Sequence, residues 1–240
     1  MFPTKNKRIS VIIPTINEAP HIGKLVKYIH QYGQNHLAEI IVVDANSTDS
    51  TREVAYYNGA HIISTAIASR AHQMNLGSKS ATGEILYFIH ADALPPKSFV
   101  NDIHKAVAGG HQFGCYRFRF NSKNPLLRVN SFFTRFKFLW CRGGDQTLFI
   151  EKKVFEQSSG FDESYVMMED FELIKRLWNQ YSFTVIPKSV IVSARKYKLN
   201  GYFKVNISNL IIFRMFQKEC DPQVLKDKYY QLIKHPKDKS

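Results

Sequence analysis

Short apolar runs alternate with amphipathic patterns along the first half of the chain. The apolar runs are rich in β-branched and aromatic residues, which predicts buried strands. They lie at residues 9–13, 39–43, 62–63 and 85–89. Between them, apolar residues recur at helical spacing, and Gly33, Gly59 and Gly83 are placed to end the predicted helices. This alternation is typical of an α/β protein with a mostly parallel, Rossmann-like sheet and helices on both faces.

Helix starts are marked within the same region. Ser50 followed by Glu53 is a capping box, which predicts that a helix begins there and that Asp49 and Ser50 cap it. Residues 70–79 are predicted to form the next helix, and Pro95 is expected to open another.

The second half of the chain is less regular. Alternation predicts strands at residues 113–120, 147–150, 183–186 and 190–192. Helical spacing predicts helices at residues 126–140, 169–178 and 203–216. The sequence has no internal repeat and no linker rich in proline, glycine or serine. We therefore expect one domain at residues 1–196, followed by a basic amphipathic helical extension at residues 197–240.

Charge and cysteine content limit the partners and the cellular compartment that we expect for the protein. The 240 residues carry a net charge of +13, and residues 195–240 hold eleven Lys or Arg against four Asp or Glu, a balance of +7. Such a charge requires a polyanionic neighbour: nucleic acid, a phosphorylated substrate or anionic lipid. Three scattered cysteines predict neither a disulfide framework nor a zinc site. No apolar run is long enough for an export signal or a membrane span, so a cytoplasmic protein is expected.

Polar residues follow the predicted strands, where ligands bind in such sheets. Pro14-Thr15-Ile16-Asn17-Glu18 follows the first strand and is neither a dinucleotide fingerprint nor a P-loop. Asp44 ends the second strand, too early to cap the next helix, where its carboxylate can accept hydrogen bonds from a ribose or a base.

Three further segments contain candidate chemistry. His90 and Asp92 stand at i and i+2 after the fourth strand, so both point the same way and can face one divalent cation. Glu169-Asp170 opens a helix, where acids either serve the helix dipole or supply a general base. The glycines of Gly143-Gly144-Asp145-Gln146 indicate close approach of the backbone to another group.

Taken together, these segments resemble glycosyltransferase family 2, whose members have the GT-A fold. In chain order the motifs are SVIIPTxNE at 10–18, EIIVVDxxSxD at 39–49, RxxQxNxG at 70–77, GEILxFxHAD at 83–92, GGDQ at 143–146, GF at 160–161, ED at 169–170 and SARK at 193–196. The HAD, GGDQ and SARK segments further resemble a short bacterial subgroup of cytoplasmic or peripheral-membrane sugar transferases.

The resemblance implies a role for each matching residue. Those expected to contact the nucleotide-sugar donor are Pro14, Thr15, Glu18, Asp44, Arg70, Gln73, Ala91 and Asp145. Arg70, Gln73 and Gly77 also share one helical face by spacing. Asp92 matches the last aspartate of the DxD metal motif, with His90 in place of the first. Asp170, with Glu169 beside it, matches the acid that deprotonates the acceptor hydroxyl.

The implied reaction is inverting sugar transfer from a nucleotide diphosphate sugar, with a UDP-sugar as the expected donor and Mn²⁺ or Mg²⁺ as the cation. His90 in place of the usual aspartate bears on metal affinity, and Ala45 replaces an acid that often follows Asp44. The QxxRW motif of processive synthases is missing, which predicts a non-processive enzyme.

Two other function classes remain open on the sequence. A sugar-phosphate nucleotidyltransferase has a related architecture, but its glycine-rich basic loop is not found at residues 14–18. A non-catalytic binder of anionic lipid on a GT-A scaffold would agree with the charge, although Asp44, Asp92 and Asp170 are all retained. No RNA-binding aromatic signature or zinc-finger spacing is present, so nucleic acid is not an expected partner.

Basic and apolar residues alternate in two segments that predict a membrane contact. If residues 126–140 are helical, Arg128, Arg135 and Arg142 form one stripe beside several aromatic residues. Residues 204–218 likewise mix Lys and Arg with apolar side chains. Such segments suit the interface of an anionic membrane, which predicts a peripheral protein on the inner membrane face with a lipid-linked or small-molecule acceptor. The alternative is that the apolar faces pack on the sheet or on a second subunit in a homodimer.

Overall fold

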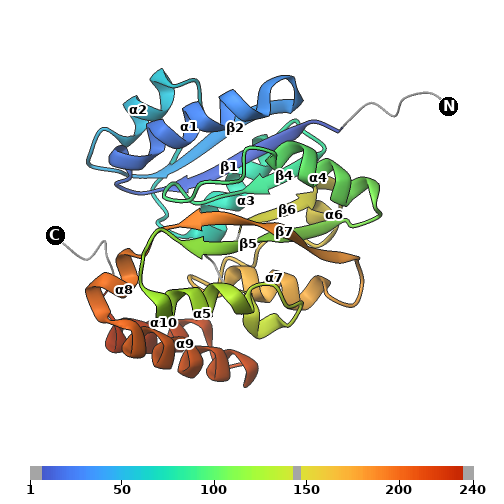
Figure 1. Ribbon diagram of the computed structural model, residues 1–240. Helices are drawn as coiled ribbons and strands as arrows, with labels where there is room; N and C mark the ends of the chain where they lie inside the picture. Colours follow the sequence, from blue (N-terminus) through green and yellow to red (C-terminus); the bar gives the residue numbers. More distant parts are fainter. Residues whose placement is uncertain (1–6, 143–146, 235–240) are drawn as a thin grey trace.

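A computed structural model describes residues 7–142 and 147–234 of the chain, and one seven-stranded sheet organises them (Figure 1). The strands are β1 (Ile9–Thr15), β2 (Leu37–Ala45), β3 (His61–Thr65), β4 (Ile85–Phe88), β5 (Phe113–Phe120), β6 (Leu148–Glu151) and β7 (Phe183–Val192). Their order across the sheet is β3-β2-β1-β4-β6-β5-β7. All pairs are parallel except those of β6, which is antiparallel to β4 and β5. The expected mostly parallel α/β fold is confirmed.

Helices cover both faces of the sheet. They are α1 (Ala19–Gly33), α2 (Thr51–Tyr57), α3 (Arg70–Ser80), α4 (Phe99–Ala108), α5 (Pro125–Phe133), α6 (Lys152–Gln157), α7 (Glu169–Leu177), α8 (Arg195–Asn200), α9 (Tyr202–Gln217) and α10 (Pro222–Leu232), with 3₁₀ turns η1 (Gln34–His36) and η2 (Leu139–Cys141). Alternate residues of β1 enter different cores: Val11 and Ile13 join the cluster with α1, whereas Ile12 joins the cluster with α3 and α7. Burial on both faces explains why the first strands are continuous apolar runs.

Several local predictions are wrong in their details. Ser50 precedes α2, but its side chain makes no capping hydrogen bond; the Asp49 carboxylate accepts from the backbone N–H of Thr51 instead, at 3.0 Å. The helix expected from Pro95 begins only at Phe99. The two strands expected at 183–186 and 190–192 are one strand, β7, whose register against β5 shifts near Arg117.

The predicted helix at 126–140 is shorter than expected, which removes the arginine stripe. α5 ends at Phe133, and η2 follows only at Leu139. Arg142 is buried, with 3% of its surface exposed, and its guanidinium donates to the carbonyl of Thr134 at 2.9 Å and to the Cys115 sulfur at 3.0 Å. It therefore fixes the turn after α5, because buried backbone carbonyls need donors.

The last two helices form a small core of their own. Ile212 and Phe216 of α9 pack with Leu225 of α10 and with Phe171 of α7. Helix α10 was not predicted, although Asp221 before Pro222 is a typical helix start and the Asp221 side chain caps it. Figure 1 shows α9 and α10 at the opposite end of the molecule from α1 and α2. Among the described residues, no helix combines the length and apolar character needed to cross a membrane.

Candidate active site

A cavity of about 540 Å³ lies beyond the carboxyl ends of β1 and β4. One part of its wall consists of charged and polar residues from the loops after β1 and β4 and from the starts of α3 and α7. The other part consists of aromatic, aliphatic and amide side chains from α5, η2, α9 and α10. We call these the donor half and the acceptor half of the cavity. The cavity therefore crosses the boundary expected between residues 196 and 197.

The loop after β1 contributes Pro14, Thr15 and Glu18 to the donor half. Asp44, in contrast, is fully buried and is not among the residues that line the cavity. Its carboxylate accepts from the Thr15 hydroxyl at 3.1 Å and from the backbone N–H of Ser47 at 2.9 Å. In this structure Asp44 therefore holds two loops together behind the wall, and a contact with a ribose or base remains a prediction.

Helix α3 brings Arg70 and Gln73 to the cavity. The Gln73 amide is buried and donates to the backbone carbonyls of Thr15 at 2.8 Å and Val43 at 2.7 Å, which ties α3 to the ends of β1 and β2. Gly77 lies against the sheet: a Cβ there would stand 2.6 Å from the Ile12 side chain. Gly77 therefore allows α3 to pack closely on the sheet, and this sets the distance between α3 and the strands beneath it.

The HAD segment brings His90, Ala91 and Asp92 to the cavity wall. It does so as a turn, in which the Ala93 N–H donates to the His90 carbonyl at 3.0 Å, and not as the extended segment that the spacing argument assumed. Asp92 accepts a hydrogen bond from Arg195 at 2.7 Å, and the same guanidinium nitrogen lies 3.2 Å from Glu18. Burial by itself would raise the pKa of Asp92, but His90 and Arg195 outweigh it and hold that pKa below its usual value. Asp92 is therefore ionised at neutral pH.

The start of α7 supplies a second pair of acids. Glu169 is buried, and one of its oxygens lies 3.3 Å from Nε of Arg70. The other oxygen has no hydrogen-bond partner among residues 7–142 and 147–234, an arrangement expected where a ligand completes the site. Burial raises the pKa of Asp170 to about 7, and the adjacent Glu169 carboxylate adds to the rise, whereas Arg70 lowers it in part.

The residue before this pair has a strained backbone. Met168 has φ of +67°, in the left-handed region that non-glycine residues seldom adopt. Met168, Glu169 and Asp170 all line the cavity. Such strain, of order 1–3 kcal/mol, persists where the surrounding structure imposes it and is concentrated at functional sites.

An amide network fixes the acceptor half. Asn130 of α5 donates to the Tyr197 hydroxyl and to Asn206, both at 2.9 Å, and accepts from the Tyr202 hydroxyl at 2.9 Å. These bonds join α5, α8 and α9. Apolar side chains beside the network remain open to solvent, with Trp140 53% and Leu210 50% exposed. This half offers stacking and apolar contact around a few fixed polar groups.

Sequence reasoning anticipated part of this site. Thr15, Glu18, Asp92 and Asp170 were predicted to belong to one site, and all four line the cavity. Asp145, also predicted, lies outside the described residues. Sequence reasoning gave Arg195 no role, although the SARK motif contains it, and it missed Lys226 and Tyr229 of α10. Within the described ranges, no cluster of three or more His, Cys, Asp or Glu could hold a metal ion by itself.

The comparisons with known proteins agree with this geometry. The model of the family described as "Glycosyl transferase family 2" matches residues 10–169, about two thirds of the chain. The chain belongs to this family, which confirms the resemblance found in the sequence.

Curated relatives match over shorter stretches. A glucosyl-3-phosphoglycerate synthase of Mycolicibacterium smegmatis is 30% identical over 98 residues, which are 38% of this chain and 32% of that protein. A 4,4'-diaponeurosporenoate glycosyltransferase of Staphylococcus haemolyticus is 34% identical over 91 residues, 35% of this chain and 24% of that protein. The chain thus spans about a third or less of the curated relatives it matches.

Solved structures share the fold at low identity. A mannosyltransferase of Pyrobaculum calidifontis, in complex with GDP-Man and Mn²⁺, aligns with a TM-score of 0.66 at 20% identity, over 95% of this chain and 69% of the other. Glucosyl-3-phosphoglycerate synthase of Mycobacterium tuberculosis, with Mg²⁺ and UDP, aligns with a TM-score of 0.59 at 18% identity, over 85% and 78%. These neighbours confirm the GT-A fold.

Proposed function

We propose that this protein transfers one sugar from a nucleotide diphosphate sugar to an acceptor hydroxyl, with inversion at the anomeric carbon. One observation carries the proposal: a single cavity holds an aspartate kept ionised and a second aspartate whose pKa is raised to about 7. Two carboxyl groups with pKa values set apart by their environments are suited to different roles in one reaction.

In this proposal the donor occupies the half formed by the first sheet loops. Pro14, Thr15 and Glu18 contact the base and ribose, with Asp44 and Ala91 in supporting positions. Arg70, together with Gln73, faces the diphosphate, where a guanidinium offers paired donors to phosphate oxygens. A UDP-sugar is the donor we expect.

The residues present suit a divalent cation that arrives with the donor. Mg²⁺ is commonly held by one or two carboxylates plus substrate phosphates, and here Asp92 supplies the carboxylate, with His90 beside it. Mn²⁺ accepts the same carboxylate and phosphate oxygens and an imidazole as well. The bound cation would neutralise charge on the departing diphosphate. The Arg195 guanidinium donates to one oxygen of that carboxylate, so it would share Asp92 with the cation.

Asp170 is the proposed general base. With a pKa of about 7 it is substantially ionised at neutral pH, yet basic enough to take a proton from the acceptor hydroxyl as the oxygen attacks the anomeric carbon. Glu169 with Arg70 positions it. Attack opposite the leaving diphosphate inverts the anomeric configuration, and one carboxylate is enough for this single displacement.

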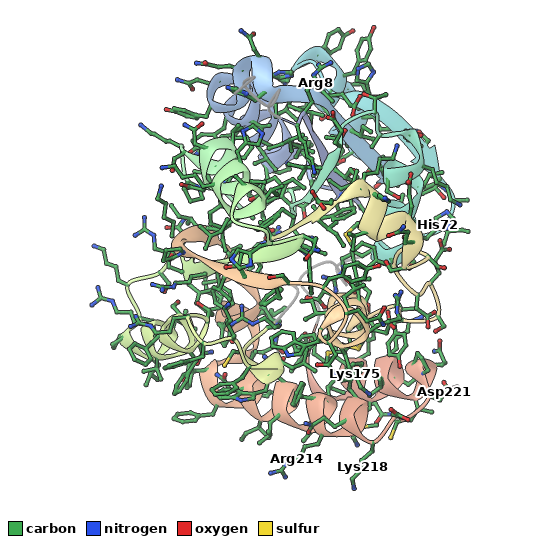
Figure 2. All side chains as sticks on the ribbon, turned by 90° about the vertical axis from the view of Figure 1, so that its right-hand side faces the viewer. Arg8, His72, Lys175, Arg214, Lys218 and Asp221 are labelled. Atoms are coloured by element: carbon green, nitrogen blue, oxygen red, sulfur yellow. The ribbon has the colours of Figure 1, made fainter. Side chains whose placement is uncertain are left out.

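We further propose a lipid-linked or amphiphilic acceptor, taken from an anionic membrane surface by a peripheral cytoplasmic enzyme. Trp140, Phe133 and Leu210 line the acceptor half and are also exposed, so an apolar chain can leave the cavity along them. Figure 2 shows Arg214 and Lys218 extending from α9 away from the body of the molecule. Basic side chains beside exposed aromatic residues suit a membrane interface. A soluble small-molecule acceptor is the second candidate, and a homodimer would compete for the same exposed faces.

The proposed activity is tested with a panel of sugar nucleotides and Mn²⁺. Release of the nucleoside diphosphate with a glycosylated product of inverted anomeric configuration, read by NMR, supports the proposal. Formation of a sugar nucleotide from a sugar phosphate would instead identify a nucleotidyltransferase. Absence of turnover and of donor binding across the panel would favour a non-catalytic lipid binder. A product that carries several sugars after one encounter would contradict the non-processive step.

A further inference from the structure

A second pocket, of about 340 Å³, lies between β5 and α5. Four arginines line it: Arg117 and Arg119 of β5, Arg128 of α5, and Arg135 just beyond α5. Its other lining residues are serines and apolar side chains, and none of those described is acidic. Arg128 and Arg135 belong to the basic segment that the sequence places beside aromatic residues, but the proposed sugar transfer gives none of these four arginines a role.

The four positive charges have no acidic partner among residues 7–142 and 147–234. Within the described part of the chain, no carboxylate lies within salt-bridge distance of any of them. The Nε of Arg117 is buried and has no hydrogen-bond partner among the described residues. A buried donor left without an acceptor costs free energy, and four like charges around one pocket add to that cost. An anion in the pocket relieves the repulsion among these like charges.

A strip of aromatic rings joins this pocket to the main cavity. The Arg135 guanidinium lies 3.8 Å from the centre of the Phe132 ring, at the pocket rim. From Phe132 the strip continues to Phe136 at 5.9 Å, to Phe138 at 6.2 Å and to Trp140 at 6.2 Å between ring centres. Trp140 lines the acceptor half of the cavity. All four rings are exposed, between 37% and 58%.

We propose that the pocket of Arg117, Arg119, Arg128 and Arg135 binds the phosphate headgroup of an anionic lipid while the aromatic strip enters the membrane interface beside it. Guanidinium groups match phosphate oxygens in geometry and charge. Aromatic rings next to basic residues are the composition of an interfacial segment. The docked protein then presents its acceptor half to the same membrane surface. This inference rests on the membrane contact proposed above but not on sugar transfer.

The aromatic strip favours a lipid over a soluble phosphate compound. A soluble anion would need the arginines only and would leave four large rings exposed to water without a use. A lipid supplies a phosphate for the pocket and an apolar interface for the rings at the same time. Exposed apolar patches bordered by charge are typical of interaction surfaces.

The test is co-sedimentation with phosphatidylcholine vesicles, with and without a fraction of phosphatidylglycerol, using the whole protein. One arginine near an anionic surface contributes about 5-fold to partitioning. The double variant Arg117→Gln/Arg128→Gln should therefore bind the anionic vesicles at least about 10-fold more weakly than the unchanged protein. The matched control is Lys24→Gln/Lys27→Gln on α1, which removes the same charge from exposed positions at the other end of the molecule. Its binding should change by less than about 2-fold.

A second pair of variants guards against loss of folding and tests the strip. Arg119→Gln/Arg128→Gln removes two exposed arginines and should show a similar loss if the Arg117 variant does not fold. Phe138→Ser should weaken binding to the anionic vesicles by about 5-fold, since a ring that enters the interface is lost. Thermal unfolding checks that each variant is folded.

Equal losses in the arginine variants and the α1 control would overturn the proposal, because net charge alone would then explain binding. Binding of inorganic phosphate by calorimetry without any partitioning onto anionic vesicles would also overturn it, in favour of a soluble anion. Sugar-nucleotide binding with Mn²⁺ is measured on the same samples. Its failure in the unchanged protein would refute the transferase proposal and leave the vesicle result standing.

Discussion

Two aspartates on the wall of one cavity have opposite acid–base character. Asp92, after β4, is held by Arg195, and its pKa lies below the usual value. Asp170, at the start of α7, is surrounded by protein next to another carboxylate, and its pKa rises to about 7. The difference shows that the side chain alone does not set acid–base character: His90 and Arg195 favour the ionised form of one aspartate, whereas burial beside another carboxylate favours the protonated form of the other.

The largest expected effect comes from removing the basic group. Asp170→Asn keeps the size of the side chain, so donor affinity should be nearly unchanged while the rate of transfer falls by about 10²–10⁴-fold. Single-turnover transfer and donor titration measure the two quantities separately. Asp162→Asn, the same change at an exposed aspartate bonded to Ser164, is the control and should keep full activity. If Glu169→Gln abolishes transfer and Asp170→Asn does not, the roles of the two acids must be exchanged.

Removing the Asp92 carboxylate should weaken binding of the donor and the cation and not slow the chemical step. Asp92→Ala should weaken binding of a sugar nucleotide with Mn²⁺ by more than about 10-fold, because loss of even an outer-sphere partner costs a metal site 10–100-fold. Calorimetry with and without Mn²⁺ measures it, and the metal-independent part of donor binding should survive. Asp162→Ala serves as the control. Normal Mn²⁺-dependent binding by Asp92→Ala would remove this residue from the cation site.

The sequence predicted the α/β scaffold and the two aspartates, but not the difference between their pKa values. β1, β2 and β4 are continuous apolar runs because both faces are buried, so a mostly parallel sheet and the polar residues at the strand ends could be anticipated. The opposite pKa values could not, since they depend on how deeply the fold buries each carboxyl and, for Asp92, also on Arg195, which reaches it from a distant part of the chain. The wall of the acceptor half could not be predicted from the sequence either. Phe133 and Trp140 were assigned to one long helix, whereas the buried guanidinium of Arg142 holds a turn between them.

The pH dependence of transfer should report Asp170 alone. The ionised carboxylate is the active form, so with a pKa of about 7 the rate at saturating donor should rise about 10-fold per pH unit below that value and level off above it. Asp92 keeps its charge throughout because its pKa is lowered, so its titration should contribute no change in donor affinity between about pH 6 and pH 8. Rates and affinities measured across this range test both statements. A flat rate profile, or an equally steep one in Asp170→Asn, would contradict the assignment.

The smallest expected effect concerns Arg195, whose guanidinium forms an ion pair with Asp92. Nη2 of Arg195 lies 2.7 Å from Oδ2 of Asp92, so a bound Mn²⁺ would share this carboxylate with a guanidinium of like charge, which opposes binding of the cation. The Arg195 side chain is 39% exposed, and an exposed ion pair contributes less than about 1 kcal/mol. Arg195→Gln should therefore strengthen Mn²⁺ binding in the absence of nucleotide by only about 3-fold, as measured by electron paramagnetic resonance titration. Arg52→Gln is the matched control, because Arg52 lies 3.9 Å from Asp44, which does not line the cavity. Weaker Mn²⁺ binding in Arg195→Gln would mean that the guanidinium positions Asp92 for the cation instead of competing with it, and the contrast between the two aspartates would then depend on His90.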